Sequence, residues 1–339
     1  MAGSLLILAS KLGYQTRAFA EAAAELGLTV AYGTDRCHVL EDPWRDRALP
    51  LRFDDPEAAS LEMVEFARNN PISGVVALGD RPVPAAARAC SVLGLPFHSS
   101  AAADICRDKY KSRTVLQRAG MMVPHFFRVP LDAPFPATAP FAAPWVLKPL
   151  ALSGSRGVIR ANDEAEARRA FARIRALLRS PEVRALRETS NDFIQVEQYV
   201  EGVEVATEAV MEHGELKLLA VFDKPDPLTG PYFEETIYVT PSRLPDLDQG
   251  RLQEALRAAA SALGLWHGPV HAEMRIAPGG GIFILEIAAR CIGGLCARSL
   301  RFSHEADLPA GSRVSLESLL VRLALGHPVG SYQREPEAS

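Results

Sequence analysis

Two glutamates near the end of the sequence are spaced so that they could bind a divalent cation. Glu273 and Glu286 lie in alternating apolar segments that flank residues 278–281 (PGGG), a pattern typical of a β-hairpin. With a turn centred between residues 279 and 280, they would lie directly opposite each other, with Cβ atoms about 5 Å apart. Such carboxylates repel unless a shared proton, an arginine or a divalent cation compensates. Magnesium accepts one or two carboxylates together with substrate phosphates.

Three basic or imidazole side chains surround this pair in the sequence. Arg290 follows Glu286 by four residues and would share its face if the strand continues, where it could stabilise an anionic intermediate or hold a carboxylate. The simpler alternative is a surface ion pair of Arg290 or Arg275 with a glutamate, because such pairs are frequent and contribute little. We assign no role to His271, since a single histidine is more often a hydrogen-bonded core residue than a ligand.

A lysine inside an apolar strand precedes a loop of small residues within residues 144–160 (PWVLKPLALSGSRGVIR). Lys148 ends the apolar run, and residues 153–157 (SGSRG) form a turn with few side chains. Such a turn lets backbone N–H groups approach an anion closely, and the lysine adds a positive charge. The segment is therefore either a nucleotide-phosphate site or a flexible hairpin with an outward-pointing lysine.

Two further segments carry acidic residues. Residues 193–211 place Glu197 at the end of one apolar strand and Glu204 at the start of the next. This is either a hairpin with solvated glutamates or an adenosine site, in which backbone groups around 197–200 would meet adenine and a carboxylate would bind ribose. Residues 222–241 are either an exposed loop or the acceptor side of an active site, with Asp223 or Glu235 recognising a substrate ammonium.

The composition argues against several classes of protein. The 339 residues, 48% hydrophobic and 23% charged, suit a globular protein of about two or three domains. The net charge of -4 gives no case for a nucleic-acid partner. The apolar run at residues 5–10 is too short for a signal peptide, and no run of about 18 apolar residues predicts a membrane span. Five scattered cysteines predict reduced thiols in a cytoplasmic protein.

The elements that would carry these residues follow two patterns. Strands and helices alternate at first, with strands expected over 5–10, 28–34 and 74–80 and helices over 14–26, 56–70 and 82–95. This order predicts a parallel sheet with helices on both faces, and its first turn lacks the G-x-G-x-x-G of a dinucleotide site. Antiparallel strand pairs are expected from residue 145. The remaining expected segments are a helix over 104–120, a proline-rich surface connection over 129–144, and helices over 163–187 and 247–263.

The motifs occur in the order of the ATP-grasp superfamily, which the chain resembles over nearly its whole length. The series comprises Lys109, Lys148, the small-residue loop, the EQYVEGVE segment (197–204), and the two glutamates with Arg290. The chain is most similar to the carboxylate–amine ligase branch, which contains amino acid (dipeptide) ligases and carnosine synthase. The resemblance implies a mixed α/β and α+β fold, in which a Rossmann-like pre-ATP-grasp parallel sheet precedes a two-lobed ATP-grasp fold with antiparallel sheets.

The resemblance also implies the domain limits. The pre-ATP-grasp domain would cover residues 1–103 and the ATP-grasp domain residues 104–330. Within the latter, a small nucleotide lobe would span about 120–200 and a larger catalytic lobe about 201–330. Residues 331–339 are polar and are expected to form a frayed tail.

The resemblance assigns the nucleotide contacts. Lys109 and Lys148 would contact the phosphates and adenine of ATP. Ser153, Ser155 and Gly157 would belong to the loop that closes over the phosphates.

It also assigns the adenosine and metal contacts. Glu197 and Val200 would meet adenine through their backbone, and Glu204 would bind ribose. Glu273 and Glu286 would hold Mg²⁺ or Mn²⁺.

The activity implied is an ATP-dependent ligation of two small molecules, a carboxylate and an amine, into an amide or peptide. The acid would attack the γ-phosphate to give an acyl-phosphate, which the amine then attacks, with Arg290 and Lys148 stabilising developing negative charge. Alternatives are a biotin-carboxylase-like or purine-pathway enzyme and a non-catalytic ATP-binding protein. Relatives commonly carry a metal-binding asparagine where this chain has Ala288, and several carry a further C-terminal lobe. A homodimer is also expected from the resemblance.

Overall fold

A four-stranded parallel sheet forms the N-terminal part of the computed structural model, which describes residues 3–10, 13–35, 48–234, 237–304 and 313–335. Its strand order is β3-β2-β1-β4. The strands are β1 (Ser4–Ala9), β2 (Thr29–Thr34), β3 (Ala48–Pro50) and β4 (Gly74–Leu78). The parallel order predicted from the alternation of strands and helices is therefore confirmed.

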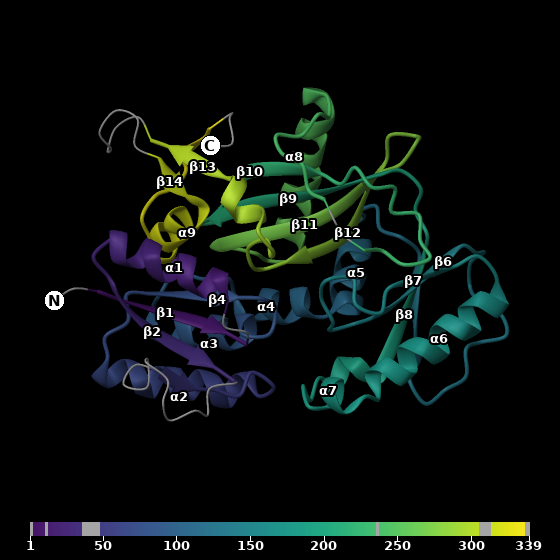
Figure 1. Ribbon diagram of the computed structural model, residues 1–339, viewed down its shortest axis with the longest axis horizontal. Coiled ribbons are helices and arrows are strands. Elements are labelled where there is room, and N and C mark those ends of the chain that lie inside the picture. The colour runs from purple at the N-terminus through teal and green to yellow at the C-terminus, as the bar shows by residue number, and fades with distance from the viewer. Residues whose placement is uncertain (1–2, 11–12, 36–47, 235–236, 305–312, 336–339) are drawn as a thin grey trace.

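Helices cover both faces of this sheet, because the β1 side chains alternate between two apolar clusters. Leu6 and Leu8 pack in the cluster that contains side chains of α2 (Pro56–Asn69) and α3 (Val83–Leu93). Leu5 and Ile7 pack in the cluster of α1 (Tyr14–Glu25) and α9 (Leu316–Ala324). Figure 1 shows α9, near the C-terminal end of the described chain, lying beside α1 over the N-terminal sheet. The fold therefore does not follow a simple linear division into domains.

Two helices, rather than the single one expected over 104–120, lead from this sheet to the rest of the chain. They are α4 (Ser100–Arg107) and α5 (Lys109–Arg118). Asp108 separates them, since its carboxylate accepts hydrogen bonds from the first backbone N–H groups of α5 and so caps that helix. The boundary predicted after residue 103 falls inside α4 and does not coincide with a break in structure.

The small lobe is an antiparallel sheet with the order β5-β8-β6-β7, covered by a helix. The helix predicted over 163–187 is interrupted, because Ser180 caps a new short helix that begins at Pro181. The proline-rich stretch is not only a surface connection, since Phe135 is buried in the lobe's core. The elements are β5 (Phe126–Pro130), β6 (Trp145–Pro149), β7 (Ile159–Ala161), α6 (Glu164–Leu178), α7 (Pro181–Arg184), η1 (Thr189–Asp192) and β8 (Phe193–Gln198).

The large lobe is an antiparallel sheet with the order β10-β9-β11-β12. Side chains of α8 pack in the same apolar cluster as β9, β11 and β12. The elements are β9 (Val203–Glu212), β10 (Glu215–Asp223), α8 (Asp246–Ala262), β11 (Gly268–Ile276) and β12 (Ile282–Ala288).

A small C-terminal sheet follows the large lobe. It contains β13 (Arg301–Ser303), β14 (Val314–Ser315) and β15 (Gln333–Arg334), and the 3-10 turn η2 (Cys296–Ser299) precedes it. Of the tail expected over residues 331–339, the structure describes residues 331–335, where β15 pairs with β13 and the Glu335 N–H donates to the Arg301 carbonyl. Of the helices in the described part of the chain, none has the length and apolar character needed to cross a membrane.

Candidate functional site

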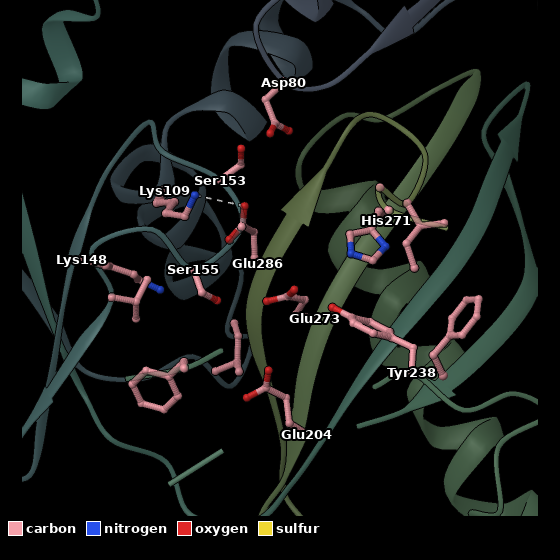
Figure 2. A pocket seen from close by; sticks show the side chains of 18 of the residues that line it. Asp80, Lys109, Lys148, Ser153, Ser155, Glu204, Tyr238, His271, Glu273 and Glu286 are labelled. Carbon is pink, nitrogen blue, oxygen red and sulfur yellow. Dashed lines mark ion pairs between the residues drawn. The ribbon is translucent and has the colours of Figure 1, made fainter. Parts of the chain in front are cut away.

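A cavity of about 790 Å³ is lined by residues of all three parts of the fold. Figure 2 shows its two main walls, with Lys109 and Lys148 on one side and Glu273 and Glu286 on the other. The lysines come from α5 and β6, and the glutamates come from β11 and β12. Asp80, from the loop after β4, brings the N-terminal domain to the same space. The fold thus gathers residues that are far apart in the sequence.

The hairpin of β11 and β12 places Glu273 directly opposite Glu286, as the sequence predicted. The path to this register differs from the expectation, however. Next to the turn, Ile276 pairs with Ile282 and Met274 with Ile284, so the turn is centred on residue 279. A bulge then leaves Leu285 as an extra residue on β12, and this shifts the register by one before the glutamates.

Each of these glutamates is ion-paired with a lysine. The Lys109 ammonium lies 3.1 Å from Glu286 Oε1, and the Lys224 ammonium lies 3.2 Å from Glu273 Oε1. Burial disfavours the charge on Lys109, but Glu286 and Asp80 outweigh it and raise the pKa of the ammonium above its ordinary value. The charge compensation that two facing carboxylates require therefore comes from lysines in this structure.

A buried ion triad lies behind the opposite wall. The Glu197 carboxylate accepts hydrogen bonds from Arg113 Nε and Nη2, at 2.9 and 2.6 Å, and lies 2.7 Å from Lys148 Nζ. Burial alone would raise the pKa of Glu197, but Arg113 and Lys148 hold it below its ordinary value. The triad fixes Lys148 inside the small lobe with its ammonium at the cavity, rather than pointing out to solvent.

The small-residue loop lies between the two walls. Ser153 and Ser155 line the cavity. The Lys109 ammonium donates a hydrogen bond to the carbonyl of Leu152, the residue before Ser153. The backbone of Ser155 has a φ of 51°, unusual for a residue other than glycine. Gly157, with a φ of 80°, is not among the lining residues; a Cβ there would come within 2.9 Å of Leu177 and 3.0 Å of Pro149. Packing and backbone conformation therefore explain this glycine.

Glu204 is also buried among cations. Lys224 Nζ lies 2.9 Å from Glu204 Oε1, and Arg275 Nε lies 2.8 Å from Glu204 Oε2. Arg275 Nη1 also donates to the carbonyl of Val200 at 2.6 Å. Glu204, Arg275 and Val200 all line the cavity, so the structure brings the expected adenosine-binding residues to it. Glu197 lines it as well, but its carboxylate is committed to the ion triad.

Arg290 lies beyond the end of β12 and does not pair with either glutamate of the hairpin. Its Nε donates a hydrogen bond to Asp80 Oδ1 at 2.9 Å, although the two residues are 210 positions apart in the sequence. Burial opposes ionisation of Asp80, but Arg290 and Lys109 outweigh it and keep the pKa of that carboxyl below its ordinary value. The charge pair lies at the end of the cavity formed with the N-terminal domain.

A buried carboxylate supports the loop that follows Arg290. Glu208 on β9 is fully buried, and its Oε2 accepts a 2.9 Å hydrogen bond from the N–H of Ile292. His271 Nδ1 lies 3.5 Å from the same oxygen, and His271 lines the cavity. Burial raises the pKa of Glu208 above its ordinary value, with His271 and the Ile292 N–H acting in the opposite direction. Glu208 therefore connects the sheet of the large lobe to the loop that follows Arg290 and lines the cavity.

The two residues proposed to recognise a substrate ammonium have different outcomes. Asp223 is not among the residues that line the cavity; its carboxylate accepts hydrogen bonds from Ser242 Oγ and the N–H of Arg243. Glu235 lies outside the described residues. The neighbouring Lys224, which sequence reasoning missed, pairs with Glu204 and Glu273 of the site.

Strand periodicity could have identified Lys224. Phe222 lines the cavity, and alternate residues of a strand share a face. Extending that face beyond β10 selects Lys224 rather than Asp223. No comparable local signal marks Asp80 or Arg113, because their partners are distant in the sequence.

The donor set of the hairpin fits a magnesium ion that also binds phosphates. Glu273 and Glu286 provide two hard oxygen ligands that face the cavity from adjacent strands. Ala288 is buried and offers no third ligand. Within the described ranges of the chain, no cluster of three or more histidine, cysteine or acidic residues is suited to hold a metal by itself. The remaining ligands would be phosphate oxygens and water, which is the usual arrangement for Mg²⁺ with nucleotides.

Comparisons with known proteins agree with this geometry. Residues 20–97 match the ATP-grasp N-terminal domain and residues 141–299 match the ATP-grasp domain. The chain is 29% identical to alanine–anticapsin ligase of Bacillus subtilis over 288 residues, covering 76% of this chain. The chain spans 60% of the length of that ligase.

Solved structures show the same architecture. An L-amino acid ligase from Bacillus licheniformis superposes with a TM-score of 0.73 at 26% identity, covering 95% of this chain and 74% of the other. A biotin carboxylase from Campylobacter jejuni, at 16% identity, shares the fold with a TM-score of 0.68 and coverage of 98% and 74%. Models of the ATP-grasp family match both halves of the fold, and the opposed glutamates face two lysines across one cavity. This chain therefore belongs to the ATP-grasp superfamily.

Proposed function

We propose that the protein is an ATP- and Mg²⁺-dependent ligase that activates a carboxylate as an acyl-phosphate and couples it to an amine. One observation carries the proposal: two opposed carboxylates face Lys109, Lys148 and the small-residue loop across a single cavity. This arrangement suits a triphosphate bound between lysines and a metal. The similarity to alanine–anticapsin ligase and to an L-amino acid ligase supports amino acids as the substrate class.

The nucleotide would lie between the two lobes. Lys109 and Lys148 would contact its phosphates, with the loop that contains Ser153 and Ser155 closing over them. The adenosine end would lie toward Val200 and Glu204, where Arg275 orders both groups. Glu273 and Glu286 would hold the metal, which supplies positive charge to the phosphate oxygens during transfer.

The carboxylate substrate would bind near the Asp80–Arg290 pair. Its oxygen attacks the γ-phosphorus, forming an acyl-phosphate as the bond to ADP breaks. The amine nitrogen then attacks the acyl carbon, forming the amide as the C–O bond to phosphate breaks and the nitrogen loses a proton. Lys109, Lys148 and Arg290 would stabilise the negative charge that develops, and no side-chain nucleophile is needed. The four cysteines in the described ranges are free, which fits the proposed cytoplasmic location.

The full chain should be incubated with ATP, MgCl₂ and pools of amino acids while phosphate release is measured. We expect release that depends on the amino acids, together with a condensation product identified by mass spectrometry. Nucleotide binding without turnover on any pool would favour a non-catalytic protein, and bicarbonate-dependent release would favour a carboxylase. Either result would refute the ligase proposal.

A further inference from the structure

The two glutamates of the hairpin are held by lysines from different parts of the chain. Lys109 is the first residue of α5, whereas Lys224 directly follows β10 in the large lobe. Each ammonium lies within 3.2 Å of an oxygen of its glutamate. Both oxygens belong to the carboxylates that a metal ion would need. A metal therefore has to compete with a lysine at each position.

Lys224 is held at this position by more than one group. Its side chain is 3% exposed, and its ammonium also lies 2.9 Å from Glu204 and 5.2 Å from the ring centre of Tyr238. Arg275 neutralises Glu204 from the other side. Because Lys224 bridges the carboxylates expected to bind ribose and metal, it links those two parts of the site through electrostatics.

The charges around the cavity are nearly balanced before any ligand binds. Among the described residues, five acidic and four basic side chains, histidine not counted, line the cavity. Of the described residues behind the lining, Lys224 and Arg113 add two basic groups through their ion pairs with lining glutamates, and Glu208 adds an acidic group 3.5 Å from the lining His271. A divalent cation alone would add two positive charges to this largely protein-lined space, which is unfavourable. A triphosphate that enters with the metal brings compensating negative charge.

We propose that Lys109 and Lys224 are resident counter-ions of the metal site, which make metal binding depend on the nucleotide. Without nucleotide, they neutralise Glu286 and Glu273 and weaken the binding of free metal. When a metal–triphosphate complex binds, the two carboxylates would bind the metal and the two lysines would pair with phosphate oxygens. Each carboxylate and each lysine thus exchanges its present partner for a group of the ligand. This inference rests on the nucleotide and metal sites of the proposed function and adds a thermodynamic coupling between them.

The coupling can be measured with Mn²⁺, whose free ion gives an electron paramagnetic resonance signal. Dissociation constants for Mn²⁺ should be determined for the full chain without nucleotide and with the non-hydrolysable analogue AMP-PNP. We expect Lys224→Met to tighten nucleotide-free Mn²⁺ binding at least tenfold and to reduce the gain given by AMP-PNP at least tenfold. Lys109→Met should act in the same direction through Glu286, and it carries the test if the first variant does not fold.

Two controls separate this role from a structural one. Lys224→Arg keeps the charge and should keep the weak nucleotide-free binding of the wild type. Lys111→Met removes an exposed lysine two residues from Lys109 and should change nothing. Nucleotide-free Mn²⁺ binding by the Lys224→Met and Lys109→Met variants that is no tighter than that of Lys111→Met would overturn the inference. Failure of the nucleotide and metal sites on which the inference rests is distinct, because the wild type would then not bind AMP-PNP with Mn²⁺, and failure of the ligase activity alone shows in the phosphate-release assay.

Discussion

Replacing Glu197 by glutamine tests whether the buried triad of Glu197, Arg113 and Lys148 stabilises the small lobe. The substitution keeps the side-chain volume but leaves Arg113 and Lys148, whose side chains are 2% and 9% exposed, without their carboxylate. Removing one partner of a buried ion pair costs about 3–5 kcal/mol. Because glutamine still offers one hydrogen-bond acceptor, we expect the lower end, a loss of about 3 kcal/mol. Most of this cost is the uncompensated positive charge.

Urea unfolding gives the measurement. At an m-value of about 3 kcal/mol per M, the expected loss lowers the midpoint by about 1 M. Glu182→Gln is the matched control, because Glu182 lies in the same lobe and pairs with Arg156 on the surface. An exposed pair of this kind contributes about 0–1 kcal/mol. A midpoint for Glu197→Gln within about 0.3 M of the control would refute the reasoning.

The same residue gives the protein a predictable response to acid. The folded-state pKa of Glu197 is below its ordinary value, so the unfolded chain binds this proton more readily than the folded chain. Its stabilising contribution is therefore complete above the unfolded pKa of about 4.3 and is lost as the pH falls through the lower folded value. Glu197→Gln should remove this part of the acid dependence, which would be visible as a smaller difference between wild type and variant at pH 3 than at pH 7.

Three other changes test separate contacts. Glu188→Gln weakens the ion pairs that Glu188 makes with Arg81 and Arg107, so amide hydrogen exchange in the small lobe should increase several-fold. Exchange equal to that of the wild type would show that these pairs do not stabilise the lobe. Gly157→Ala should lower the free energy of unfolding by about 1–3 kcal/mol more than Gly154→Ala. Both residues have a positive φ, but only the Cβ added at residue 157 would contact neighbouring atoms. Equal unfolding midpoints for the two variants would contradict this. Asp80→Asn should lower kcat/KM for the carboxylate substrate at least tenfold with little change in KM for ATP, since Arg290 loses its charged partner. A change confined to the KM for ATP would contradict the placement of the carboxylate substrate near this pair.

Features encoded within a short stretch could be predicted from the sequence. The opposed glutamates follow from strand alternation around one turn, and the parallel sheet follows from alternating strands and helices. The helix breaks at Asp108 and Ser180 were also readable as caps in principle, because an acid or hydroxyl preceding a helical run is a typical start signal. The predictions of single continuous helices over 104–120 and 163–187 failed because the apolar periodicity continued across each break.

Contacts between distant segments could not be predicted from local patterns. Nothing near α9 indicates that it packs over the N-terminal sheet, because its apolar face would suit any partner. Likewise, the Asp80–Arg290 and Glu188–Arg81 pairs join segments more than 100 residues apart. A charged residue in a sequence has many possible partners, and only the packing of the lobes selects one.

The bulge at Leu285 connects these local and distant features. If the register set next to the turn continued with no bulge, Glu273 would pair with Leu285 and Glu286 with Ala272, so the two carboxylates would no longer be opposite each other. Arg113 of α5 donates hydrogen bonds to the carbonyls of Ile284 and Leu285, and thus to the backbone at the bulge. The same guanidinium pairs with Glu197, which in turn holds Lys148. One buried arginine therefore fixes the hairpin that we propose to bind metal and the lysine that we propose to bind phosphate relative to each other, through a contact that no local motif reveals.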